Sequence, residues 1–284
     1  MSELRLSARL RGMPGDPTDR ASGMTNSLRD LARRASLEGG RVIRAAGAST
    51  GAVEEKGAGD YVTRVDRAAE EAITSLLLAE DPDAHVVGEE RGGDRGDRYW
   101  LVDPLDGTTN FVHGLPVVGV SVALIEGGRP ITGAVHAPFL DTTFTAGRAL
   151  GAEQDGRPLR VSSRDPSEAI VATGFPFRYK HRLPEFRRVL LPALEQFEDL
   201  RRAGSASLDL AWTAAGVFDG FFELGLSPWD VAAGALLIEE AGGVITDWSG
   251  GGDYLAGDVL AGTPAVHRAL LELASGSGPN PRPS

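Results

Sequence analysis

Two aspartates stand three positions apart in the segment 100–110, which has the sequence WLVDPLDGTTN. The apolar residues that open this segment predict a strand, which would deliver the carboxylates of Asp103 and Asp106 to its carboxyl end. Pro104 keeps the backbone of Asp103 extended, and Gly107 permits a sharp reversal after Asp106. Carboxylates in this arrangement, with the intervening backbone carbonyl, suit Mg²⁺, which prefers hard oxygen ligands. The alternative is that both aspartates only cap a turn or a helix.

Three further carboxylates lie beside apolar segments elsewhere in the chain. Glu89 follows a predicted buried strand, Asp66 stands at a predicted helix start, and Asp230 lies in the first turn of an otherwise apolar helix. Taken one at a time, each has a structural explanation: a solvated loop residue, an N-cap, or a favourable interaction with the helix dipole. Gathered in one place without cations, such groups would repel one another strongly. They therefore either lie apart in space or hold metal.

The composition of the 284 residues argues against several other kinds of site. The net charge of −11 disfavours a nucleic-acid or anionic-membrane surface, which needs a basic field, although metal cations would still let the protein bind an anionic substrate. The absence of cysteine excludes disulfides, zinc thiolates and iron–sulfur clusters. The five histidines show no pair spacing typical of an imidazole metal site. No apolar run approaches the roughly 20 residues that span a bilayer, and the N-terminus has no secretory signal, so we expect a cytoplasmic protein.

Helices and strands are mixed through the middle of the chain, which predicts stacked α and β layers rather than a barrel. In the first half we expect a helix over 28–46 capped by Asn26 or Ser27, a helix from Asp66 to Leu77, and strands at 85–87, 99–102, 117–125, 131–136 and 142–145. In the second half we expect helices over 184–197, 207–215 and 228–241 and from 264, with strands near 170–173, 200, 221–224, 244–247 and 259–261.

The two ends of the chain differ from this middle. Residues 1–25 are polar and rich in Arg, Gly, Pro and Asp, which predicts a flexible N-terminal extension. Residues 275–284 are rich in Gly, Pro and Ser, which predicts a disordered tail. Between these ends we find no internal repeat and no linker.

Taken together, the motifs resemble those of the inositol monophosphatase family, within the wider superfamily of Mg²⁺-dependent, lithium-sensitive phosphatases. The similarity covers about residues 28–272, and five ordered motifs are far more specific than one short pattern. The matching elements are Gly88-Glu89-Glu90, the segment 100–113, Arg202-Ala-Gly-Ser-Ala206, Asp219-Gly-Phe-Phe-Glu223, and Trp229-Asp230-Val-Ala-Ala-Gly followed by Glu240-Ala-Gly-Gly243.

The resemblance implies a layered αβαβα sandwich and a homodimer. It implies one catalytic unit over 26–274, with an α+β half over about 26–160, an α/β half over about 161–274, and the site at their junction. Two to three Mg²⁺ ions are implied. The first would be held by Glu89, Asp103 and the carbonyl of Leu105, the second by Asp103, Asp106 and Asp230, and a weaker third would lie near Glu89.

Metal-assisted in-line hydrolysis of a phosphate monoester is the reaction that the resemblance implies. Thr108, hydrogen-bonded towards Asp66, would orient the attacking water and help remove its proton. The backbone N–H groups of Gly107 and Thr108, at a predicted helix start, would bind the phosphate. Lys56 resembles a residue of the family's mobile active-site loop, and the alternative is a solvent-exposed lysine. No covalent intermediate is required.

The expected substrate is a small phosphorylated polyol or sugar, and no nucleic-acid or membrane partner is expected. Segments 174–177 and 201–205 look most like bacterial inositol monophosphatases, which favours myo-inositol monophosphate. The positions that would contact substrate are Glu89, Leu105, Asp106, Gly107, Thr108, Arg201, Gly204, Ser205, Ala206, Glu223 and Asp230.

Two alternatives stay open. Relatives that act on histidinol phosphate, fructose 1,6-bisphosphate or 3′-phosphoadenosine nucleotides share the metal motifs. A non-catalytic regulatory protein on the same scaffold would be marked by lost ligands, and no ligand is substituted here. Glu223, which would accept a hydrogen bond from a sugar or inositol hydroxyl, has the alternative role of a solvated carboxylate at a strand end.

Overall fold

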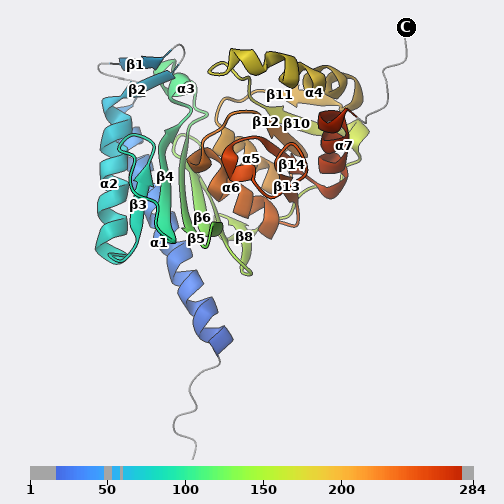
Figure 1. The fold of residues 1–284 in the computed structure, drawn as a ribbon. Coiled ribbons are helices and arrows are strands. Elements are labelled where there is room, and N and C mark those ends of the chain that lie inside the picture. The colour runs from blue at the N-terminus through green and yellow to red at the C-terminus, as the bar shows by residue number, and fades with distance from the viewer. Residues whose placement is uncertain (1–16, 48–52, 58–59, 277–284) are drawn as a thin grey trace, which may run out of the picture.

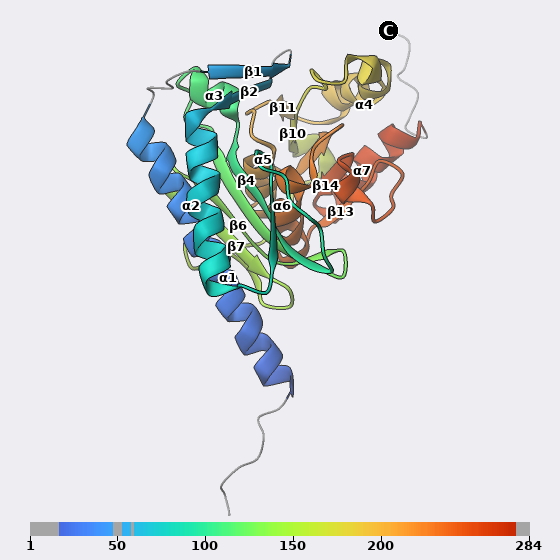
Figure 2. The same ribbon diagram turned by 60° about the vertical axis from the view of Figure 1, so that its left-hand side comes forward.

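Five alternating layers of helices and strands make up the described part of the chain, residues 17–47, 53–57 and 60–276 of this computed structural model (Figure 1). A seven-stranded and a five-stranded sheet alternate with three pairs of helices (Figure 2). In layer order the helices are α1 (Pro17–Ala46) and α2 (Arg64–Glu80), α5 (Ala206–Ala214) and α6 (Pro228–Glu240), and α4 (Leu183–Gln196) and α7 (Pro264–Ser275). The layered αβαβα sandwich expected from the sequence is confirmed.

The seven-stranded sheet follows chain order from β3 to β9. Strands β3 and β4 are parallel, and the remaining neighbours are antiparallel. The expected hairpin is confirmed, because β5 and β6 pair across the Gly127-Gly128 turn. Strands β8 and β9 were not predicted from the sequence, because they are short and polar. The strands are β3 (His85–Gly88), β4 (Arg98–Asp106), β5 (Gly119–Glu126), β6 (Arg129–Ala137), β7 (Thr142–Gly147), β8 (Gly151–Gln154) and β9 (Arg157–Pro158).

The five-stranded sheet has the order β11-β10-β12-β14-β13, so neighbouring strands are often distant in the chain. Strand β10 is parallel to β11 and β12, and β14 is antiparallel to β12 and β13. All five lie where the sequence predicts strands. They are β10 (Ile170–Thr173), β11 (Asp199–Arg201), β12 (Gly220–Glu223), β13 (Val244–Thr246) and β14 (Val259–Gly262).

Three apolar clusters fill the spaces between the layers. One packs α1 and α2 on the outer face of the large sheet, and another packs α4 and α7 on the outer face of the small sheet. The central cluster packs α5 and α6 between the two sheets. Residues 231–238 of α6 are all buried, because a helix covered on both sides is apolar all round. The carboxyl end of β4 and the amino ends of α5 and α6 therefore meet between the two sheets.

The remaining elements are short. Strands β1 (Val53–Gly57) and β2 (Asp60–Thr63) form a two-stranded ribbon beside α3 (Thr108–Val112) (Figure 1). The ribbon was outside the expected strands. The 3₁₀ helices are η1 (Pro166–Glu168), η2 (Lys180–Arg182) and η3 (Tyr254–Ala256).

The first helix begins earlier than expected. We expect a cap at Asn26 or Ser27, but α1 begins at Pro17, so residues 17–25 of the expected flexible extension are helical. Asn26 Oδ1 accepts a hydrogen bond from Arg29 on the next turn, and extending a formed helix costs far less than starting one. Residues 1–16 lie outside the described part, as do 277–284 of the expected disordered tail. Helix α7 ends at Ser275, followed by Gly276 in a left-handed conformation. Among the described helices, none is long and apolar enough to cross a membrane.

Candidate functional site

A β-bulge near the end of β4 directs Asp103 and Asp106 into one cavity. Asp103 pairs with Ser121 of β5 and Asp106 pairs with Gly119, so three steps along β4 oppose two along β5. Successive residues of a regular strand point to opposite faces, and residues three apart would diverge. The bulge removes this divergence. As a result, both aspartates line the same cavity.

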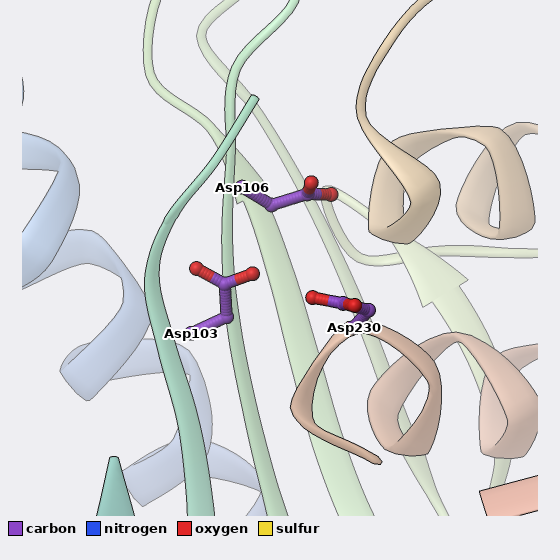
Figure 3. A group of neighbouring side chains, drawn as sticks. All are labelled: Asp103, Asp106 and Asp230. Atoms are coloured by element: carbon purple, nitrogen blue, oxygen red, sulfur yellow. The ribbon is translucent and has the colours of Figure 1, made fainter. Parts of the chain in front are cut away.

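Asp230 joins them from a distant part of the chain (Figure 3). It lies in the first turn of α6, where its Oδ2 accepts a 2.7 Å hydrogen bond from the backbone N–H of Ser227. One carboxylate oxygen from each of Asp103, Asp106 and Asp230 lies within 4.8 Å of the others, and the three side chains point towards one another. Capping of a turn by the two aspartates of β4 does not explain this convergence.

Full ionisation of the three-aspartate cluster is unfavourable without a cation. Burial raises the pKa of Asp103 well above its usual value, and the rise is increased by the charges of Glu89, Asp106 and Asp230. Burial also raises the pKa of Asp230 to about 6, with Asp106 adding to the shift. A divalent cation would turn this repulsion into attraction. Because all donors are hard oxygens, the residues present fit Mg²⁺.

Two serines at the start of α5 fix the carboxylate of Asp106. Its Oδ2 accepts hydrogen bonds from Ser205 Oγ at 2.6 Å, from Ser207 N at 2.8 Å and from Ser207 Oγ at 2.6 Å. Burial raises the pKa of Asp106, and these hydrogen bonds oppose the rise. Ser205 lines the cavity, as expected for a substrate contact, but its hydroxyl donates to Asp106.

Glu89 reaches the cavity from the end of β3, and a second glutamate holds the loop that carries it. Glu70 of α2 is buried, and its carboxylate accepts hydrogen bonds from the backbone N–H groups of Glu90 at 2.8 Å and Arg91 at 3.0 Å. A Cβ at Gly88 would overlap the Glu70 carboxylate, so any larger residue there would displace that carboxylate. Glu70 thus fixes the turn that directs Glu89 into the cavity.

We expect Glu70→Ala to lower the free energy of unfolding by about 2 to 4 kcal/mol, because it leaves two backbone N–H groups without their acceptor. Chemical denaturation followed by circular dichroism measures this loss. Glu71→Ala is the matched control, because Glu71 is exposed and makes a surface ion pair with Arg91 that contributes about 0–1 kcal/mol. Equal effects of the two substitutions would contradict the role given to Glu70.

Thr108 connects the cavity to the buried Asp66. Its Oγ1 lies 3.2 Å from Asp66 Oδ1 and 3.1 Å from the carbonyl oxygen of Leu105. The hydrogen bond from Thr108 to Asp66 is the one expected from the sequence. Leu105 and Thr108 both line the cavity, and the one hydroxyl proton of Thr108 has two acceptors within reach, Asp66 Oδ1 and the Leu105 carbonyl.

Gly107 and Asn110 join the end of β4 to the second half of the chain. Gly107 has φ +92°, and a Cβ there would lie 2.9 Å from the carbonyl oxygen of Val117 and 3.2 Å from that of Gly204. Asn110 Nδ2 donates to the carbonyl oxygens of Val117 at 2.8 Å and Ala203 at 2.9 Å. Helix α3 begins at Thr108, directly after this junction, as the sequence predicts.

The opposite wall of the cavity comes from the five-stranded sheet. Glu223 ends β12 and lines the cavity together with Gly204 and Ala206. A Cβ at Gly174 would overlap the Glu223 carboxylate, so glycine makes room for it. Burial raises the pKa of Glu223 to about 8, and the charge of Asp230 adds to the shift.

Aromatic and cationic side chains surround the mouth of the cavity. The guanidinium of Arg202 lies 5.9 Å from the ring centre of Phe175 and 5.6 Å from that of Phe177. Both rings are partly exposed and line the cavity, as do Arg178 and Tyr179. Arginine side chains thus surround the mouth of the cavity, and carboxylates line its interior. An anionic substrate can bind in such a cavity only when the negative charge of the interior is neutralised.

The structure does not bring Arg201 to the cavity, which corrects its expected position. Arg201 ends β11, pairs with Asp199 and donates to the carbonyl of Leu200 at 2.9 Å. Successive residues of an extended chain point to opposite sides, so Arg202 lines the cavity and Arg201 lies on the outer surface. Lys56 lies in β1, and its side chain is outside the described part of the structure.

Several residues of the site were not singled out from the sequence. Ser207 holds Asp106, and Arg202 and Asp209 line the cavity. Ser205 and Asp209 are four residues apart at the start of a helix, and such residues share one face. That spacing is the signal that connects Asp209 to the Gly-Ser-Ala motif.

The fold and the carboxylate cluster define a phosphatase-type scaffold, and comparison with known proteins identifies which one. The model of the inositol monophosphatase family matches residues 24–277, and the chain belongs to this family. "Nus factor SuhB" of Salmonella typhimurium is 44% identical over 248 residues, which are 85% of this chain and 93% of that protein.

Solved structures agree with this assignment. The extragenic suppressor protein SuhB from Bartonella henselae is 35% identical with a TM-score of 0.83, and the match covers 87% of this chain and 98% of that one. The inositol monophosphatase from Anabaena is 31% identical with a TM-score of 0.77, and the match covers 89% of this chain and 97% of that one.

Proposed function

We propose that this protein is a Mg²⁺-dependent phosphate monoesterase whose first-choice substrate is myo-inositol monophosphate. The observation that carries the proposal is the convergence of Asp103, Asp106 and Asp230 within 4.8 Å in a cavity that Glu223 also lines. Membership of the inositol monophosphatase family supports it, because that family implies a phosphorylated substrate.

The residues that would hold the ions follow from the donors at the cavity. Glu89, Asp103 and the Leu105 carbonyl would hold one ion, and the cluster of three aspartates would hold another. A third, weaker site would lie near Glu89. When bound, Mg²⁺ makes a nearby water more acidic and neutralises charge on the phosphate and the leaving alcohol.

The chain's own groups would orient the reactants. Thr108 would take the proton of the attacking water and pass its own hydroxyl proton to the carboxylate of Asp66, to which it is hydrogen-bonded. Gly107 and Thr108 would donate their backbone N–H groups to the phosphate at the start of α3. Lys56, in strand β1 of the two-stranded ribbon, is proposed as a further catalytic residue. Most of the rate enhancement in this scheme comes from positioning and charge stabilisation.

The alcohol would lie between the cluster and β12. Glu223 would accept a hydrogen bond from a ring hydroxyl, with Gly204 and Ala206 beside it. Because Arg201 faces outwards, Arg202 would make the substrate contact that the sequence motif assigned to Arg201. Histidinol phosphate, fructose 1,6-bisphosphate and 3′-phosphoadenosine nucleotides remain alternative substrates, and the aromatic rings at the mouth are compatible with the last of these.

Phosphate release from inositol, sugar, histidinol and nucleotide monophosphates, with and without Mg²⁺, tests the proposal. We expect Mg²⁺-dependent release that is fastest with myo-inositol monophosphate and is inhibited by Li⁺. No metal-dependent release from any ester would reject the enzymatic function. A clear preference for histidinol phosphate would replace only the substrate.

A second proposal comes from the relatives named Nus factor SuhB. Their name favours an additional regulatory role in which a macromolecule binds outside the cavity. Co-purification from cells of native protein and of an inactive cavity variant tests it, since retention of one partner by both would separate regulation from catalysis.

We also propose a cytoplasmic homodimer without membrane association. Sedimentation at micromolar concentration tests the dimer.

A further inference from the structure

Asp209 is a buried acid that the catalytic scheme does not use. It lies in α5, is 2% exposed and lines the same cavity as the three-aspartate cluster. Its Oδ1 atom has no hydrogen-bond partner among the described residues. An unpaired buried carboxyl oxygen costs free energy, so its presence needs an explanation other than stability.

The backbone of Asp209 serves the helix, but its side chain does not. Its N–H donates to the carbonyl oxygen of Ser205 at 3.0 Å, and its carbonyl oxygen accepts from Thr213 Oγ1 at 2.8 Å. These are helical contacts that any residue type except proline would allow at position 209. The carboxyl group is therefore not required for the fold of α5.

The surroundings of Asp209 indicate which ligand it would bind. Burial raises its pKa well above the usual value, the charges of Glu223 and Asp106 add to the rise, and Arg202 opposes it. Within the described ranges, Asp209 is not part of the group of three carboxylates that could hold a metal ion. A phosphate group would be repelled by two neighbouring acids. A neutral hydroxyl can donate to a carboxyl oxygen without adding charge, so a hydroxyl group fits this wall best.

We propose that Asp209 is a specificity-determining residue that binds a free hydroxyl of the substrate alcohol, next to the hydroxyl bound by Glu223. The inference rests on the proposed function and narrows its substrate class to phosphate esters of polyols with at least two free hydroxyls. A site built to hydrogen-bond a hydroxyl discriminates strongly against analogues without one, because its polar groups are then left unpaired.

The test compares two esters in the full-length protein with Mg²⁺. Myo-inositol 1-phosphate carries free hydroxyls, and p-nitrophenyl phosphate carries none. We expect Asp209→Ala to lower the ratio of their kcat/KM values by about tenfold or more, the loss expected for one hydrogen bond to a buried acceptor. Asp209→Asn keeps one oxygen acceptor and should give an intermediate ratio. If p-nitrophenyl phosphate turns over too slowly, its competitive inhibition constant replaces its kcat/KM.

Controls separate substrate binding from general damage. Glu223→Gln should change the ratio in the same direction, and Asp165→Asn, which removes a negative charge at an exposed position outside the cavity, should not change it. Mg²⁺ binding measured by calorimetry and inhibition by inorganic phosphate report the integrity of the phosphate side. If Asp209→Ala fails to fold, Asp209→Asn carries the test, with an expected fall in the ratio.

Two negative results have different meanings. An unchanged ratio in folded Asp209 variants, or equal losses for both esters, would overturn the role of Asp209 while leaving the phosphatase intact. Absence of Mg²⁺-dependent release by the native protein from every ester would reject the proposed function itself.

Discussion

Asp230→Asn is expected to reduce turnover of the preferred phosphate ester by roughly a hundredfold to a thousandfold, the loss typical of removing one strong electrostatic contact from an active site. The substitution keeps the shape of the side chain but removes its charge from the three-aspartate cluster (Figure 3). The remaining carboxylates would then bind a cation more weakly. Steady-state kinetics over a range of Mg²⁺ concentrations measures both the loss and the Mg²⁺ requirement.

Asp230 has a second role at the start of α6, and the experiment needs a control for that role. Asp230 also accepts the backbone N–H of Ser227, so a loss of activity could come from fraying of α6. Ser227→Ala keeps that N–H and the Asp230 carboxylate but removes the Ser227 side chain that caps the start of α6, so it measures the effect of a weakened helix end alone, and we expect it to retain most turnover. Near-normal activity of Asp230→Asn would remove Asp230 from the proposed metal site. A parallel loss in Ser227→Ala would point to the helix end instead.

The second large effect concerns stability without divalent cations. We expect the free energy of unfolding of the metal-free protein to fall by on the order of 3 kcal/mol between pH 5 and pH 8, since one unit of pKa shift corresponds to about 1.4 kcal/mol. Glu223, whose pKa is raised to about 8 by burial, with Asp230 adding, contributes across this range, and the raised pKa values of Asp103 and Asp209 act in the same direction. Asp230 itself, with a pKa raised to about 6, contributes over the lower part of this range.

The sign follows from the protonation of the two states. In the unfolded chain Glu223 loses its proton near its ordinary pKa of 4.5, whereas in the folded protein it keeps the proton until about pH 8. Between these values the folded state binds more protons, so raising the pH favours unfolding. The stabilising contribution is fully present below pH 4.5 and is lost as the pH rises through 8.

Saturating Mg²⁺ should reverse this loss at pH 8. At a hundred times its dissociation constant, an ion that binds only the folded state adds about 2.7 kcal/mol. The gain should be smaller at pH 5, because carboxylate ligands must be deprotonated to bind metal. Denaturation in EDTA and in Mg²⁺ at both pH values measures these effects. Glu223→Gln should flatten the pH dependence, while Glu195→Gln, at an exposed position on α4, should not.

The sequence identified the acidic residues of the candidate site and predicted most of the fold. Asp103, Asp106 and Asp230 are recognisable from their motifs, and the apolar segments around them predict strands and helices because burial requires those periodicities. Stacked α and β layers also followed from the sequence, since hairpins and helix-separated strands require packed sheets, whereas the order αβαβα was implied by the family resemblance. The early start of α1 did not, because helix extension at a polar end depends on small differences in free energy.

Only the tertiary structure decided how these residues meet. The bulge in β4 turns Asp103 and Asp106 to the same side, and a pairing register between strands is not visible in one strand's sequence. The sequence also does not show that Arg202, and not Arg201, lines the cavity, because this depends on which side of β11 faces the cavity. Both the sequence and the tertiary structure were needed to recognise Asp209. Its place one turn after Ser205 is visible in the sequence, but the burial of its carboxyl group without a partner for Oδ1 depends on the packing of α5 between two sheets. Local pattern fixes which groups are present, and long-range packing fixes which of them share a cavity.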